Sequence, residues 1–257
     1  MKKWILVFAL ILLIIFLCAC GSKTEPAGTA SNTSSAAQAS NSAASSKDRD
    51  YEIDQVFSRT FQGTDGEHFQ GSFCVTNTGK TPLFLSAAFW ELKDSSGKTI
   101  TTSSQQPGTF ASPTVIDVGE TSWYFINALV ERMTDGSGDI ADAVPIYQRP
   151  PRLNEGIDFK RFQVSDLTLQ EKDGRIAAFG TVENNSDLSS PALIYVNLFD
   201  KDGHLVGQLV DEFMSIGAGD KMSFTAEVDT RKNSGELALV LSDIASFDAV
   251  AFYSTNK

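Results

Sequence analysis

Short stretches with alternating apolar and polar residues dominate the chain after its first fifty positions. In FQGSFCVTN the alternation puts Phe69, Phe73 and Val75 on one strand face and Cys74 on the other. Gly, Asn, Asp and Pro interrupt such stretches at the short intervals typical of β-sandwiches. No segment shows sustained helical periodicity, although residues 234–247 leave a strand and a short helix open. The pattern predicts an all-β fold.

The pattern of strands and turns occurs twice along the chain. The segment WELKDSSGKTI begins at Trp90, VNLFDKDGHLV begins at Val196, and the two align without a gap. Further landmarks correspond in the same order, at shifts of 100 to 108 residues. They are the Asp-Gly turn signals at 65–66 and 173–174, Asn77 and Asn184, Gly119 and Gly219, and DAVPIY at 142–147 with DAVAFY at 248–253. Chance similarity between strands would not preserve this order, so we infer an internal duplication.

The duplication predicts two domains of one fold in tandem. We expect an immunoglobulin-like β-sandwich at residues 51–149, the first repeat, and another at residues 157–257, the second repeat. Pro150-Pro151 lies between the repeats, and prolines at this point would stop a sheet from running through.

The N-terminus has the composition of a secretion signal. Lys2 and Lys3 precede an apolar run over residues 4–17, which is shorter than the roughly 20 residues of a bilayer-spanning helix. The next residues, Leu17-Cys18-Ala19-Cys20, resemble a bacterial lipobox. This resemblance implies that residues 1–19 are a lipoprotein signal peptide and that Cys20 becomes the lipidated N-terminus. A plain signal peptide and an uncleaved helix are the alternatives.

Residues 20–50 are expected to be the lipidated N-terminus and a flexible Ser/Ala-rich linker. From Gly21 to Ser46 the chain contains no Val, Ile, Leu, Met or aromatic residue, so it cannot bury enough apolar surface to fold. If Cys20 carries lipid, we expect the protein to be extracytoplasmic and to have the bacterial membrane as a partner, through this N-terminal lipid anchor. Cys74 would be the one unmodified thiol left, so neither predicted domain can contain a disulfide.

A family resemblance rests on the strand before each turn at 94–97 and 200–203. VNLFD at 196–200 resembles the signature of the FxLYD domain, an immunoglobulin-like module of bacterial lipoproteins, with Val196 in place of its Phe and Phe199 in place of its Tyr. WELKD at 90–94 is the more divergent match. The resemblance implies a fold and a surface location, and it carries no catalytic residues to this chain.

Charge and motif content narrow the function classes. The chain has 21 Lys and Arg against 32 Asp and Glu, so we expect no nucleic-acid partner, which would require a basic patch. The sequence contains no H-x-x-x-H pair, phosphate loop or nucleophile elbow, and we predict no catalytic residue, metal or cofactor. The calcium reading of DKDG at Asp200 is disfavoured because Gly203 comes early and position twelve is Asp211 rather than Glu. His68 and His204 are interpreted as exposed strand-end residues.

The segment between Ile100 and Ile116 is six residues longer than its counterpart in the second repeat, and it carries Phe110 as a candidate ligand contact. We predict a non-enzymatic binding or adaptor module that recognises a protein or cell-wall ligand through loops or an unpaired strand edge. The first alternative is an accessory subunit of an envelope transporter or cell-wall enzyme. The second is a hydrolase of envelope polymers, which predicts a concave pocket lined by carboxylates.

Overall fold

The computed structural model describes residues 50–101, 108–136, 139–147, 151–153, 157–228 and 239–256. These residues form antiparallel strands almost throughout, which confirms the predicted all-β class. Within these ranges no helix has the length and apolar character needed to cross a bilayer. The predicted signal peptide, Cys20 and the linker up to residue 49 lie outside the described residues, as does Pro150.

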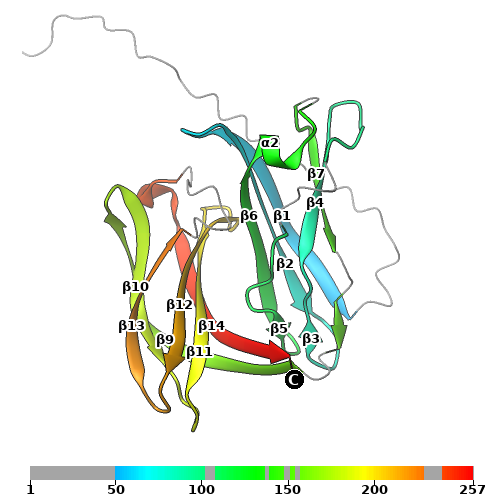
Figure 1. Cartoon of the computed structure of the whole chain (residues 1–257). Helices are drawn as coiled ribbons and strands as arrows, with labels where there is room; N and C mark the ends of the chain where they lie inside the picture. Colours follow the sequence, from blue (N-terminus) through cyan, green and yellow to red (C-terminus); the bar gives the residue numbers. More distant parts are fainter. Residues whose placement is uncertain are drawn as a thin grey trace, which may run out of the picture. The chain divides into compact units, whose positions relative to one another are not determined.

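The first repeat consists of small antiparallel sheets (Figure 1). The largest has the strand order β1 (Tyr51–Gln62), β2 (Glu67–Asn77) and β6 (Thr121–Leu129). A second sheet pairs β4 (Ala88–Lys93) with β7 (Asp142–Tyr147). In the third, β3 (Leu83–Phe84) lies between β5 (Val115–Ile116) and β8 (Arg152–Leu153), which follows residue 149 and so lies beyond the predicted end of the first repeat. A short helix, α2 (Val130–Met133), follows β6 directly.

The second repeat closes into a barrel of six strands in the order β10-β13-β12-β11-β14-β9 (Figure 1). Its strands are β9 (Ile157–Lys172), β10 (Arg175–Glu183), β11 (Ser190–Phe199), β12 (Leu205–Ile216), β13 (Lys221–Val228) and β14 (Ser246–Asn256). We expected two separate sheets here. The barrel closes instead because β12 pairs with both β11 and β13, while β14 pairs with both β11 and β9. The segment left open between strand and helix contains a 3₁₀ turn, η2 (Leu241–Asp243), and the start of β14.

Each repeat has its own hydrophobic cluster. In the first, Phe73 stacks on Tyr124 at 4.4 Å between ring centroids, and Trp90 packs against Phe73 edge-on. The predicted inward face of β2 is confirmed, since Phe69, Phe73 and Val75 are all buried in this cluster. The second cluster contains Val196 and Leu198 of the VNLFD segment and their neighbours, among them Ile194, Phe224 and Ala226.

The corresponding asparagines make corresponding hydrogen bonds in the two repeats. Asn77 and Asn184 are both buried. The Nδ2 group of Asn77 donates to the carbonyl oxygen of Ile116, and that of Asn184 donates to the carbonyl oxygen of Ile216. Each amide also donates to the carbonyl oxygen four residues further along the chain. The side chain therefore ties the loop after β2 or β10 to the strand end that it faces.

The first strand of each repeat contains the same irregularity. Gln55 in β1 has φ of 53°, and Asp166 in β9 has φ of 55°; each lies at a break in the pairing register. A positive φ is uncommon outside glycine, so its recurrence at matching places indicates that β1 and β9 correspond. It aligns β1 with β9 at a shift of 111 residues, which the sequence comparison did not include.

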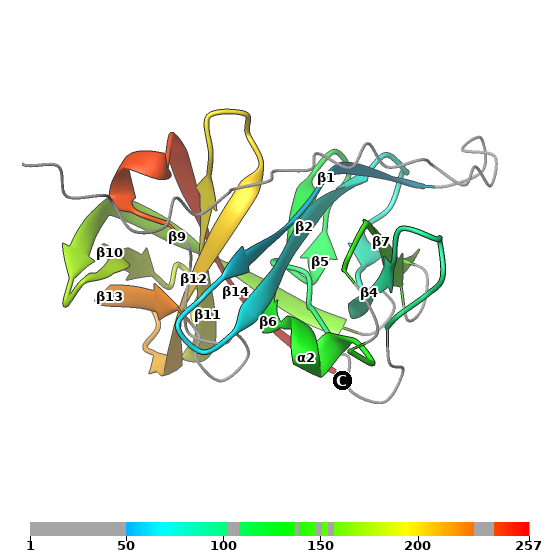
Figure 2. The same cartoon turned by 90° about the horizontal axis from the view of Figure 1, so that it is seen from above.

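Polar side chains join the two repeats. On β2, Gln70 Nε2 donates to the carbonyl oxygen of Val206 at 2.9 Å, and Ser72 Oγ donates to that of Leu205 at 2.7 Å. Gln208 Nε2 donates to Ser112 Oγ at 2.8 Å in the opposite sense. Figure 2 shows β12 beside β2 and β6, the strands that it contacts. The strand β12 of the second repeat thus packs on one face of the first repeat's main sheet.

Candidate functional site

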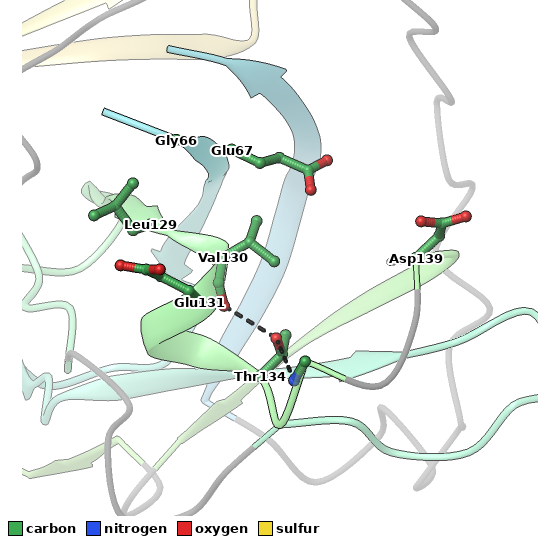
Figure 3. A pocket seen from close by; sticks show the side chains of 8 residues that line it. Gly66, Glu67, Leu129, Val130, Glu131, Thr134 and Asp139 are labelled. Carbon is green, nitrogen blue, oxygen red and sulfur yellow. Dashed lines mark hydrogen bonds between the residues drawn. The ribbon is translucent and has the colours of Figure 1, made fainter. Parts of the chain in front are cut away.

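A pocket of about 370 Å³ opens at the hairpin end of β2, where β6 runs into α2 (Figure 3). This volume lies within the range of small-molecule sites. Its lining residues are Gly66, Glu67, Leu129, Val130, Glu131, Thr134, Gly136 and Asp139. The pocket was not predicted, because its residues come from two separate stretches of sequence with no shared motif.

Local turns position the pocket walls. Gly66 has φ of 145° in the β1–β2 hairpin, a conformation that suits glycine. After α2, Thr134 Oγ1 donates to the carbonyl oxygen of Val130 at 3.1 Å and accepts from the Gly136 amide at 3.3 Å (Figure 3). These bonds close the turn after α2 that carries Thr134 and Gly136, both of which line the pocket.

The pocket is acidic with an apolar floor. Glu67, Glu131 and Asp139 contribute carboxylates from different sides of the pocket, and no Lys or Arg among the described residues lines it (Figure 3). Of the apolar lining residues, Leu129 is buried and Val130 is partly buried. Carboxylates around a pocket produce a negative potential, so the arrangement is suited to a positively charged group rather than an anion.

His68 is buried beside this hairpin, which corrects its interpretation as an exposed strand-end residue. Its Nε2 lies 2.6 Å from Asp65 Oδ1, its Nδ1 lies 3.3 Å from Asn127 Oδ1, and its ring stacks on Phe61. The hydrogen bond with His68 lowers the pKa of the Asp65 carboxyl. The alternation of β2 placed His68 on the face opposite the core, and the sequence did not show that this face is covered.

Asp200, Asp202 and His204 form a second group, at the turn between β11 and β12. One ligand atom from each lies within 4.8 Å of the others. Asp200 Oδ1 accepts hydrogen bonds from the backbone amides of Asp202 and His204, both at 2.9 Å, as an Asp at the start of a turn commonly does. His204 is only partly exposed and stacks on Phe57 of the first repeat, so it is not the isolated strand-end residue that the sequence indicated.

A fixed cation lies near this turn. The Arg59 guanidinium sits 5.9 Å from the Phe57 ring and 5.8 Å from the Phe61 ring, with Nε donating to Gln70 Oε1. Burial lowers the pKa of Arg59, and the charge of Asp200 opposes that effect. The positive charge of Arg59 near Asp200 lowers the affinity of this turn for a metal ion, because the guanidinium and a metal cation repel each other.

The remaining sequence candidates lie apart from the pocket. Burial raises the pKa of the Cys74 thiol to about 11, so it stays protonated at neutral pH and is a poor nucleophile. Phe110 is 55% exposed and therefore accessible to a ligand. Cys20, the predicted lipidation site, lies outside the described residues.

No protein-family model, curated protein or solved structure matches the chain. The function proposed below therefore rests on the residues and their geometry.

Proposed function

We propose that the protein is a lipid-anchored, extracytoplasmic binding or adaptor module of a bacterial envelope, built from two tandem FxLYD-type immunoglobulin-like repeats. The observation that carries the proposal is the order of its segments. A lipobox ending at Cys20 is followed by a polar linker and then by the all-β repeats. In this arrangement lipid on Cys20 holds the chain at the membrane, and the linker lets the repeats reach a ligand.

Two structural features support a binding role. The pocket at Glu67, Glu131 and Asp139 is concave, and Phe110 offers an exposed aromatic side chain. Aromatic side chains and concave surfaces are the usual contact points in recognition sites. Residues 51–149 and 157–257 are proposed as the two modules, because each repeat has its own hydrophobic cluster.

Fractionation of bacteria that express the full chain tests the anchor. We expect the wild-type protein in the membrane fraction and labelled by an alkyne fatty acid, and Cys20→Ala unlabelled. Cys18→Ala is the matched control, because Cys18 leaves with the signal peptide and its substitution keeps Cys20. Equal labelling of wild type and Cys20→Ala would refute the anchor.

Cross-linking in intact cells tests the binding role. We expect the full chain to be cross-linked to a defined envelope protein or cell-wall polymer, less so in Phe110→Ala or Glu67→Gln/Glu131→Gln. Stable co-purification with one membrane complex, unaffected by these substitutions, would favour the accessory-subunit alternative instead.

The three pocket carboxylates also favour the second alternative, a hydrolase of envelope polymers, because such enzymes use paired carboxyl groups. Release of soluble fragments from purified cell wall by the wild type, and its loss in Glu67→Gln, would support that reading. Intact cell wall after incubation with the full chain would leave the binding module as the conclusion.

A further inference from the structure

The outer edge of β1 presents backbone groups that pair with none of the residues that the structure describes. The Thr78 amide donates to the Asp50 carbonyl oxygen at 3.0 Å, so Asp50 forms a hydrogen-bonded pair with β2. Hydrogen-bonded and non-bonded pairs alternate along an antiparallel ladder, so Glu52 and Asp54 also bond to β2. The N–H and C=O of Ile53 therefore point away from β2. Because β1 is the outermost strand of its sheet, they face the open edge.

The outer edge of β7, in the two-stranded sheet with β4, is blocked. Ala88 exchanges backbone hydrogen bonds with Thr109, on the side away from β7. The backbone N–H and C=O groups of every second residue of β4 from Ala88, including Trp90, therefore also point away from β7. Pro145 is the partner of Trp90, and its ring nitrogen consequently faces the outer edge without an N–H. A proline in this place protects an edge strand from adding another strand. The first five residues of β1, Tyr51–Gln55, contain no proline or lysine.

Three carboxylates flank the open edge. Asp50, Glu52 and Asp54 are exposed and alternate with Tyr51 and Ile53, so they share the face of β1 opposite the core. No described residue forms an ion pair with any of the three. A strand added beside β1 would place every second side chain next to these carboxylates.

The second repeat lacks these charges. The shared irregularity aligns Asp50, Glu52 and Asp54 with Arg161, Gln163 and Ser165. Both sets are exposed, so burial does not explain the difference. The acidic edge is a property of the first repeat alone.

We propose that the edge of β1 at Asp50–Asp54 binds an extended segment of a partner protein in which basic residues alternate with apolar ones. The segment pairs with the outward N–H and C=O of Ile53, and its Lys or Arg side chains lie next to the three carboxylates. A second molecule of this protein is a poor occupant, because two such edges would bring like charges together. This inference rests on the proposed binding role and names the site and partner chemistry.

Fluorescence anisotropy with the full chain and a labelled Lys-Val-Lys-Val-Lys-Val peptide tests the proposal. We expect this peptide to bind saturably, with an affinity that falls as the salt concentration rises. The matched peptide with Glu in place of Lys should not bind. Ile53→Pro removes the outward N–H while leaving the β1–β2 ladder intact, and should weaken binding about tenfold. Ile53→Ala keeps the N–H and should bind within about threefold of wild type. Glu52→Gln/Asp54→Ser, which introduces the residues of the second repeat, should weaken binding and flatten its salt dependence.

Hydrogen exchange of the wild-type chain gives a reading independent of the variants' folding. Peptide addition should slow exchange at the Ile53 amide and leave the amides of β9 unchanged. Absence of peptide binding, or binding without protection at Ile53, would overturn the proposal. A dimer in light scattering that Ile53→Pro dissociates would also overturn it, by assigning the edge to a second molecule. An envelope ligand cross-linked equally by wild type and Ile53→Pro would refute the β1 edge but leave the proposed binding role in place.

Discussion

At the scale of single residues, buried asparagines stabilise both repeats. Asn77 and Asn184 each have under 2% of their surface exposed, and each donates to carbonyl oxygens on two segments of its repeat. A buried carbonyl oxygen that loses its donor keeps the cost of desolvation. These two side chains therefore contribute more to the stability of the fold than is usual for polar residues, most of which lie at the surface.

We expect Asn184→Ala to lower the free energy of unfolding by about 1–3 kcal/mol, because it leaves the Ile216 carbonyl without this donor. Asn185 is the matched control, since it is exposed, and Asn185→Ala should change stability by less than about 0.5 kcal/mol. Urea denaturation of the two variants measures the difference. Equal stabilities would show that solvent replaces the Asn184 amide.

The Cys74 thiol predicts a pH dependence. Its pKa in the folded protein, about 11, lies above the ordinary thiol value of 9.0 because burial disfavours the thiolate. The stabilisation that this thiol provides is therefore complete below about pH 9 and is lost as the pH rises through 11. We expect stability to fall more steeply over this window in wild type than in Cys74→Ala, as measured by urea denaturation at each pH. Parallel declines would contradict the assignment.

At the scale of elements, a proline distinguishes the strand β7 from its counterpart β14. Pro145 of β7 occupies the place of Ala251 of β14 in DAVPIY and DAVAFY. Ala251 pairs with Ile194 on one side and Phe162 on the other, which helps to close the barrel. Among the strands that the structure describes, β7 pairs only with β4, where a proline with its nitrogen at the outer edge is tolerated.

Exchanging these residues should have unequal effects. Ala251→Pro removes a ladder hydrogen bond in a strand paired on both sides, so we expect a loss of about 1–3 kcal/mol or more. Pro145→Ala should cost at most about 1 kcal/mol, through the added freedom of the unfolded chain. Thermal unfolding of both variants checks this, and similar losses would indicate that β14 does not need its N–H at this position.

At the scale of the whole molecule, the contact between the repeats differs from their interiors. It contains Gln70, Ser72 and Gln208, all buried, whereas the two hydrophobic clusters remain separate. Polar interfaces of this kind are typical of domains within one chain. Gln70 and Ser72 on β2 donate to main-chain oxygens of β12, so these two bonds depend on the position of β12 rather than on its side chains.

We expect Gln70→Ala to weaken the coupling between the repeats, because the Val206 carbonyl oxygen loses a buried donor at a cost of about 1–3 kcal/mol. Calorimetry of the full chain should then show a broader or divided unfolding transition. Gln163→Ala is the control, since Gln163 is exposed on β9. An unchanged single transition in Gln70→Ala would show that this bond does not couple the repeats.

The sequence by itself determined the strand class and the inward face of β2. Alternation along one strand is a local property, so Phe69, Phe73 and Val75 could be assigned to the core without their partners. The turn at 200–203 could likewise be located from the sequence, because such turns depend on neighbouring residues.

Only the tertiary structure decided which outward faces are covered and which edges stay open. His68 and Cys74 lie on the outward face of β2, and packing against β12 and the neighbouring strands buries that face. The pocket at Glu67 and Glu131 joins residues from two distant stretches, and the closure of the barrel depends on pairings between strands far apart in sequence. A sequence pattern indicates the conformation and the burial that each residue favours. The partner of a strand across a sheet or an interface lies far away in the sequence, so the local pattern does not identify it.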